Sequence, residues 1–434
     1  MIQKKKSRAV MIAALAVSVT VAAGLSGCSS AAPTSGLGSK ASGTVQFWDR
    51  SAITPWSKQV VAAFNASHKD VQVKITSIND AQLSSKLATA LRTNNVPDLV
   101  TTDDVDAISY ISAGQFLDLT RAIDDAKLRD VLSKPQLALA TVSGKNYGTP
   151  AVLDASVLLY SKKLFAQAGI AGPPANLTEA LDDARKIHAL SADDYGFYFP
   201  GACSGCLAFG VMPNLYADGA DLVTGDDLHA QTATVEGNES LQKTLQFYQD
   251  LWTEGLTPKA AQSDTGSGWA TNFQKGNVGM AAMGLFGYTT ATPEEQKDIG
   301  IAPLPGASGG ISTFIGGANF GIPKKAKNAA GAWEFIQYAL GKKMQELTPS
   351  GGFAPVRTDL VNDAAFKAAN PIVVPGLTAS VTGRSLHTLY HNQLFSVPAG
   401  PWQKMFTKAV FGGDVKGAIT EGQAGFEAVL KGNG

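Results

Sequence analysis

After residue 43 the chain alternates between strand-like and helix-like hydrophobic patterns. Short apolar alternation predicts strands at residues 44–48, 71–75 and 97–100. Helical spacing of apolar side chains predicts helices between them, at residues 55–64 and 80–91. Strands that alternate with helices favour a mostly parallel sheet, in which ligands bind beyond the carboxyl ends of the strands.

The stretch 144–160 is predicted to be a turn, then an extended entry through Pro150, and then a buried strand that contains one acid, Asp154. Charges in apolar strands are rare unless they are paired or hydrogen-bonded. Asp154 therefore either belongs to a structural network or faces a wet cleft and accepts donors from a ligand. A chain of 434 residues is too long for one core, and we interpret this strand as the passage from one lobe to the next, past a ligand cleft.

Charge and the amino terminus narrow the class of protein. Lys and Arg together number 36, as do Asp and Glu, so there is no basic excess that would indicate nucleic-acid binding. A basic start and a short apolar run predict an export signal over residues 1–27, followed by Cys28 in a lipobox-like context. Residues 28–43 are then a lipidated, Gly/Ser-rich flexible tether to the membrane. The alternatives are a plain signal peptide or an anchoring helix.

An ordered series of motifs covers nearly all of the remaining chain. G-x-x-Y-G-x-P begins at Gly144 and Y-x-x-x-L-F-x-x-A-G at Tyr160. From Phe273 the chain reads F-x-x-G-x-φ-G-M, which is close to the pattern F-x-x-G-x-φ-A-M. Later come G-G with φ-x-I-P-K from Gly316 and a G-x-φ-P-V-R loop that ends at Arg357. This series resembles the extracellular solute-binding proteins of ATP-driven sugar importers, the family that includes maltose-binding protein.

The resemblance implies an α/β fold of two lobes, each with a mixed, mostly parallel sheet, joined by a hinge of crossing strands. It implies an N-terminal lobe of residues 44–152 with 303–342, and a C-terminal lobe of 153–302 with 343–434. The second crossing is expected at residues 299–305. A carbohydrate, expected to be an oligosaccharide, is captured between the lobes and delivered to membrane permease subunits. The protein is expected to be a monomer without cofactor or metal.

Candidate ligand contacts come from the ends of the predicted strands and from the family resemblance. Trp48, Asp49 and Arg50, and then Asp103 and Asp104, lie at the ends of predicted parallel strands, although a core tryptophan and a helix cap are alternative roles. By resemblance, Asp154 matches an acid that binds sugar hydroxyls. The other candidates by resemblance or position are Phe209, Phe286 and Tyr288 as aromatics, Asn319 as a cleft amide, Arg357 as a ligand clamp or an ion-pair partner across the lobes, and Trp402 as a second stacking ring.

Cys203 and Cys206 form a C-x-x-C pair, which in an exported chain favours a disulfide over a metal half-site. Three other motifs are discounted. The sequence Asp-Thr-Gly-Ser at 264–267 occurs once, whereas an aspartic protease needs two acids. Residues 306–310 fit G-x-S-x-G without the strand and helix of a nucleophile elbow, and His387 with His391 is too small a ligand set for a metal.

Two other functions stay open at this stage. A secreted carbohydrate-active enzyme could use a carboxylate pair such as Asp49 and Asp154 for acid–base catalysis. A binding protein for another solute is the second alternative: a polyamine site would show several carboxylates boxed by aromatics, and an iron site clustered tyrosines.

Overall fold

The computed structural model describes residues 37–380 and 382–432. The predicted export signal and lipidated Cys28 lie outside these residues. In the described part, no helix combines the length and the apolar composition that crossing a membrane requires.

One sheet organises the fold, with strand order β2-β1-β3-β14-β6-β10-β7 and with β11 also paired to β6. β1 is parallel to β2 and β3, as the alternating pattern predicts, whereas β14 is antiparallel to β3 and to β6. The strands are β1 (Gly43–Arg50), β2 (Val71–Ile78), β3 (Leu99–Asp103), β6 (Thr149–Ser161), β7 (Tyr195–Tyr198), β10 (Val278–Gly284), β11 (Ile299–Ala302) and β14 (Ile315–Gly321).

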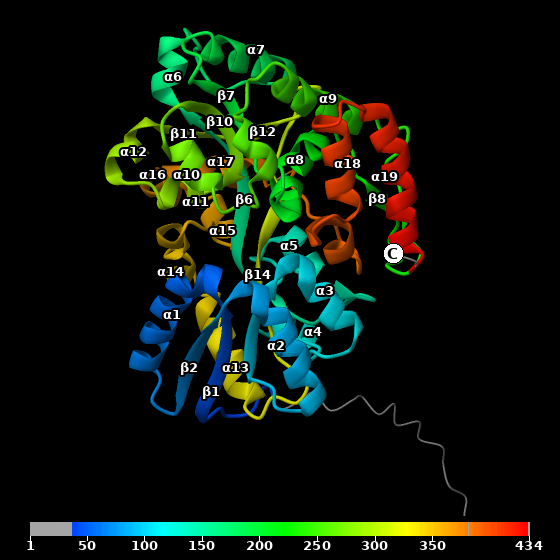
Figure 1. The fold of residues 1–434 in the computed structure, drawn as a ribbon. Helices are drawn as coiled ribbons and strands as arrows, with labels where there is room; N and C mark the ends of the chain where they lie inside the picture. The colour runs from blue at the N-terminus through cyan, green and yellow to red at the C-terminus, as the bar shows by residue number, and fades with distance from the viewer. Residues whose placement is uncertain (1–36, 381, 433–434) are drawn as a thin grey trace, which may run out of the picture. The chain divides into compact units, whose positions relative to one another are not determined.

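Strand β6 belongs to both lobes (Figure 1). Its first half, to Ala155, pairs with β14, and its second half, from Ser156, pairs with β10 and β11. Every residue of β6 is buried except Asp154 and Tyr160, which are half-buried. An almost continuous apolar run is what a strand covered on both faces requires, so β6 crosses between the lobes as its sequence predicts.

Helices cover the first-lobe part of the sheet, around β1, β2 and β3. Helix α1 buries Trp56, Val60, Val61 and Phe64, the face that its spacing predicts. The helices between β1 and β6 are α1 (Thr54–Ser67), α2 (Asp80–Thr93), α3 (Asp104–Ser112), α4 (Thr120–Asp125) and α5 (Lys134–Leu139). After β14 the chain adds α13 (Ala329–Ala339) to the same core.

The second lobe has its own core, in which α8 packs against the second half of β6, while α9, α18 and α19 pack with α8 and with one another (Figure 1). Its helices are α6 (Lys162–Gln167), α7 (Leu177–His188), α8 (Ser204–Ala217), α9 (Glu239–Thr253), α10 (Trp269–Gln274), α11 (Phe286–Thr289), α12 (Pro293–Asp298), α17 (Val374–Ala379), α18 (Pro401–Val410) and α19 (Val415–Leu430).

The return to the first lobe comes later in the chain than expected. Residues 299–302 are β11, which pairs with the second half of β6, and β12 (Leu304–Pro305) pairs with β13 (Ile311–Ser312). Asn214 of α8 also donates to the Pro305 carbonyl at 2.6 Å. The expectation that 299–305 forms the second crossing is therefore wrong, and β14 makes it.

Helix α14 (Lys342–Gln345) packs on first-lobe residues. The Trp56 indole N–H donates to the Met344 carbonyl at 3.1 Å, and the Gln345 amide donates to the Ala151 carbonyl at 3.0 Å. The precise division of the chain between the lobes stays a prediction.

Candidate ligand-binding site

A cavity of about 600 Å³ lies where β1 and β3 end and where β6 and β14 cross. This volume is within the range of small-molecule sites, about 300–1,000 Å³. Both lobes contribute to its wall, through residues such as Arg50, Asp103, Asp154, Phe209, Phe286, Phe314, Phe353 and His391. Five of these are candidates from the sequence: Arg50, Asp103, Asp154, Phe209 and Phe286.

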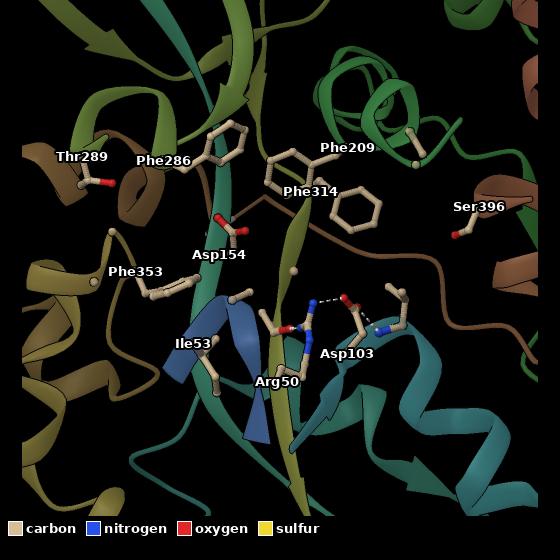
Figure 2. A pocket seen from close by; sticks show the side chains of 18 of the residues that line it. Arg50, Ile53, Asp103, Asp154, Phe209, Phe286, Thr289, Phe314, Phe353 and Ser396 are labelled. Atoms are coloured by element: carbon tan, nitrogen blue, oxygen red, sulfur yellow. Dashed lines mark hydrogen bonds and ion pairs between the residues drawn. The ribbon is translucent and has the colours of Figure 1, made fainter. Parts of the chain in front are cut away.

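Arg50 and Asp103 form an ion pair on the first-lobe side of the cavity (Figure 2). Arg50 Nη2 lies 2.7 Å from Asp103 Oδ2, and Arg50 Nη1 donates to the Gly317 carbonyl of β14. Asp103 Oδ1 also accepts the Val105 N–H at 3.2 Å and so caps α3. Asp103 therefore has both expected roles, since it caps a helix and lines the cavity.

Asp154 is the charged group on β6 inside the cavity, and its carboxylate has no hydrogen bond or ion pair from residues 37–380 or 382–432. Burial raises its pKa to about 7, the nearby Arg50 charge lowers it, and the Asp103 charge raises it. Of the two roles predicted from the sequence, the structure excludes a structural network within the described protein. The carboxylate is instead available to a ligand.

Phenylalanine rings form the apolar wall (Figure 2). Phe209 lies 5.6 Å from Phe314 between ring centroids, and buried Trp269 joins Phe209 at 6.4 Å to Phe286 at 5.4 Å, both edge-to-face. Phe353 completes the wall from the loop after residue 348. We call Phe209, Phe286, Phe314 and Phe353 the phenylalanine cage.

Two candidates form a buried network close to the hinge strands instead of lining the cavity. Asp104 Oδ1 accepts from Asn319 at 2.7 Å, and its Oδ2 accepts from Gln136 at 3.0 Å. Gln136 also donates to the Val152 carbonyl of β6 and the Gly316 carbonyl of β14, at 3.1 and 3.3 Å. Burial raises the pKa of Asp104 to about 8. Asp104 and Asn319 thus join the crossing strands, which makes them positioning residues.

Asp49 is fully buried and points away from the cavity. It accepts from Thr54 at 2.8 Å, Ser57 at 3.1 Å and Thr101 at 2.8 Å, which fixes the start of α1 against β3. Burial raises its pKa to about 6, against the lowering effect of these hydrogen bonds. Asp49 is therefore not in a position to contact a ligand in the cavity. The hypothesis that Asp49 and Asp154 form a pair of catalytic acids is wrong.

Three more candidates, all aromatic, lie away from the cavity wall. Trp402 is fully buried in the second-lobe core, where it packs 6.0 Å from Phe395. Trp48 is half-buried under the Lys86 ammonium, 4.7 Å from the ring centroid. Tyr288 follows Phe286 on α11 and is half-buried against the core.

Arg357 does not span the lobes. Its Nη2 lies 2.7 Å from Asp359 Oδ2, two residues further on, and its Nη1 donates to the Leu340 carbonyl at 3.0 Å. The side chain fixes a local turn, so the alternative of an ion pair across the lobes is not realised.

Phe314, Phe353 and His391 are among the wall residues that sequence reasoning missed. Phe314 precedes the Gly-Gly pair of β14, and Phe353 stands in the loop for which only Arg357 was considered. From the sequence, His391 is discounted as a metal ligand, yet the structure places it in the cavity wall, where it is 5% exposed. Both of its ring nitrogens lack a partner within the described residues, and burial lowers its pKa to about 4.

Cys203 and Cys206 are joined in a disulfide at the start of α8, the helix that carries Phe209. The motifs at residues 264–267 and 306–310, discounted from the sequence, have structural roles. Asp264 accepts from Tyr198 and from two backbone N–H groups of its own turn, and Gly306 to Gly310 is a tight turn closed by one backbone hydrogen bond of 2.9 Å. Among the residues described, no cluster of three or more His, Cys, Asp or Glu could hold a metal ion.

The cavity between two α/β lobes, at a hinge of crossing strands, defines a two-lobe binding protein. Residues 50–346 match the family described as bacterial extracellular solute-binding protein, and the chain belongs to this family. The predicted family is thereby confirmed.

Known relatives agree with this family. The chain is 26% identical over 344 residues to the diacetylchitobiose binding protein DasA of Streptomyces coelicolor, which covers 77% of this chain and 79% of that protein. It is 25% identical over 296 residues to a maltooligosaccharide ABC transporter solute-binding lipoprotein of Streptococcus pneumoniae, 65% of each chain.

Solved structures confirm the fold. The GacH receptor of Streptomyces glaucescens, solved unliganded and with acarbose, superimposes with a TM-score of 0.76 at 25% identity over 90% of this chain and 99% of that one. The cyclic α-maltosyl-1,6-maltose binding protein of Arthrobacter globiformis gives 0.77 at 21% identity, over 90% and 100%. The predicted two-lobe α/β fold is confirmed.

Proposed function

We propose that this protein captures a carbohydrate between its lobes and delivers it to the permease of an ABC transporter. The observation that carries the proposal is the cavity, in which an unpartnered carboxylate, Asp154, lies among aromatic rings. Apolar ring faces pack against the C–H faces of a pyranose, and carboxylates accept hydrogen bonds from its hydroxyls. Relatives named for sugars support the same ligand class.

Binding without turnover fits this site better than catalysis. A glycosidase needs two carboxyl groups that flank the scissile bond, one of them a proton donor. Asp49 is buried outside the cavity, and Asp103 is held by Arg50, so Asp154 is left without an available acidic partner on the wall. We therefore expect the sugar to leave the protein chemically unchanged.

The rival solutes fit less well. No tyrosine is among the described residues of the cavity wall, which disfavours an iron site of clustered tyrosines. A polyamine would need carboxylates for its several charges, and Asp154 is the one acid of the described wall without a partner.

The family supports an extracytoplasmic location. We propose further that a lipid on Cys28 anchors the protein to the membrane. Residues 28–43 would then be a flexible tether that lets the folded part contact the permease subunits. Mass spectrometry of the protein from its native membrane tests the anchor, because an unmodified Cys28 or cleavage elsewhere would contradict it.

A thermal-shift screen of the purified protein against mono- and oligosaccharides, polyamines and iron chelates tests the ligand class. A ligand at one hundred times its Kd stabilises the native state by about 2.7 kcal/mol. We expect a shift with one class of sugar, recovered intact. Shifts confined to polyamines or iron complexes would contradict the carbohydrate, and cleaved sugar would contradict pure binding.

A further inference from the structure

The charges on the cavity wall do not cancel. Arg50 is the one arginine or lysine among the described residues of the wall. It forms an ion pair with Asp103 at 2.7 Å and donates a hydrogen bond to the Gly317 carbonyl. Asp154 remains without a partner on the described wall. When Asp154 is ionised, the described wall therefore carries one net negative charge, and none of its residues forms an ion pair or hydrogen bond with the Asp154 carboxylate.

The surroundings of Asp154 give this charge a particular setting. Figure 2 shows its carboxylate among the rings of Phe286, Phe353 and Phe209. The spacing is tight on the Phe286 side: a Cβ added to Gly284 would meet Phe286 Cδ1 at 2.9 Å and Asp154 Oδ1 at 3.1 Å. On the other side, a Cβ on Gly316 would touch the main chain of Asp154 and the ring of Phe209.

Aromatic faces and a carboxylate together favour a cation over a neutral group. The negative face of a ring attracts an ammonium, and this attraction increases when both are removed from water. A neutral hydroxyl donates one hydrogen bond to the carboxylate and leaves its charge uncompensated, whereas an ammonium donates hydrogen bonds and also cancels the charge. An unpaired carboxylate in an apolar pocket is unfavourable until such a group arrives.

We propose that the ligand is an amino sugar whose protonated amine pairs with Asp154 inside the phenylalanine cage. This inference rests on the proposed carbohydrate function and narrows it to a class of sugar. The rest of the sugar then lies toward the Arg50–Asp103 pair, which offers the donors and acceptors on the opposite side of the cavity.

Two matched sets of sugars test the proposal by isothermal titration calorimetry at pH 7 on the purified protein. One set is glucose, glucosamine and N-acetylglucosamine, and the other is cellobiose, the β-1,4 glucosamine dimer and its diacetylated form. The members of each set differ only at C2. We expect the amine of at least one set to bind at least tenfold more tightly than its neutral partners.

Asp154→Asn keeps the size of the side chain and removes its charge. We expect this variant to weaken binding of the amine at least a hundredfold and binding of the neutral sugars less than tenfold. Asp106→Asn is the matched control, because Asp106 is a nearby half-buried acid that lines a neighbouring small pocket with Arg50 and Asp103. It should change the affinity for the amine less than threefold.

The melting temperature of ligand-free Asp154→Asn at pH 8 gives a second readout. We expect it to equal or exceed that of the parent, because the variant removes an uncompensated carboxylate; a large decrease would mean that Asp154 has a structural partner, against the proposal.

The remaining outcomes separate this inference from the proposed function. If in both sets a neutral sugar binds as tightly as its amine, or Asp154→Asn keeps the preference for the amine, the amino-sugar inference is wrong and the carbohydrate function stands. If only putrescine or spermidine binds, both are wrong. Absence of binding by both amino sugars at millimolar concentration also overturns the inference.

Discussion

Arg50 Nη2 lies 2.7 Å from Asp103 Oδ2, and this ion pair joins the carboxyl ends of two parallel strands, β1 and β3, at the edge of the cavity. Arg50 also donates to the Gly317 carbonyl of β14, one of the two crossing strands. The side chain of Arg50 is 13% exposed and that of Asp103 is 34% exposed, so solvent screens the pair only in part. The pair links the first-lobe sheet to the hinge and presents polar atoms to the ligand.

Arg50→Ala should weaken both folding and binding. We expect the free energy of unfolding to fall by about 1–3 kcal/mol, because Asp103 loses its partner in a half-buried place. Ligand affinity should fall at least tenfold. Urea unfolding and calorimetry measure the two effects.

Arg129→Ala is the matched control for Arg50→Ala. Its ion pair with Asp124 is on the surface, with side chains 40% and 50% exposed. We expect a change below about 1 kcal/mol and unchanged affinity. Equal effects of the two substitutions would show that the Arg50–Asp103 pair has no special role.

Two aromatic substitutions should separate the cavity wall from the core. Phe353→Ala removes a ring from the phenylalanine cage and should lower affinity at least tenfold with a small loss of stability.

Trp402→Ala should lower the free energy of unfolding by about 3–5 kcal/mol, because it empties a fully buried site. Its affinity, measured where the variant is still folded, should stay within about threefold. A selective loss of affinity in Trp402→Ala would place Trp402 at the ligand after all.

Stability should depend on pH through the buried acids near the hinge. Burial raises the pKa of Asp49 to about 6 and that of Asp104 to about 8, both from 3.8. The native state therefore holds more protons than the unfolded chain between about pH 4 and pH 8, and these groups lose stabilising effect as pH rises across that window. One such group changes the free energy by at most about 1.4 kcal/mol per pH unit.

Asp104→Asn removes the largest of these contributions to pH dependence. The variant should become more stable relative to the parent as pH rises from 5 to 8, with denaturant unfolding as the measurement. Parallel stability curves for parent and variant would show that Asp104 is ionised in the native state over this range.

Reduction of the disulfide should have a modest effect. Cys203 and Cys206 are three residues apart, so the closed loop is small and its loss should lower the free energy of unfolding by less than about 3 kcal/mol. Affinity should fall by less than tenfold, because α8 also keeps its start through Ser204, which donates to the Phe395 carbonyl at 2.7 Å. Melting curves with and without reductant test this, and the Cys203→Ser, Cys206→Ser double variant should not respond to reductant.

Local patterns were sufficient for the elements and for part of the site. The alternation of strands and helices predicts β1, β2 and β3 as parallel neighbours, and the nearly continuous apolar run of β6 predicts a strand buried on both faces. Residues at the ends of parallel strands, and one acid inside an apolar run, are visible without a structure. Arg50, Asp103 and Asp154 could be selected on that basis because strand ends meet at one edge of a sheet.

The direction of each side chain was decided by the tertiary structure. Asp49 and Arg50 are neighbours in β1, yet successive side chains of a strand point to opposite faces, so Asp49 is buried against α1 while Arg50 reaches the cavity. Asp103 and Asp104 also separate, at the junction of β3 and α3: Asp103 caps the helix and lines the cavity, and Asp104 is buried with Asn319. Phe314, Phe353 and His391 are far from Asp154 in sequence and reach it only because β14 and the later loops fold back onto β6. The sequence by itself determined which segments become strands and helices, since those depend on local periodicity; which residues share one cavity depended on long-range packing, which no local pattern records.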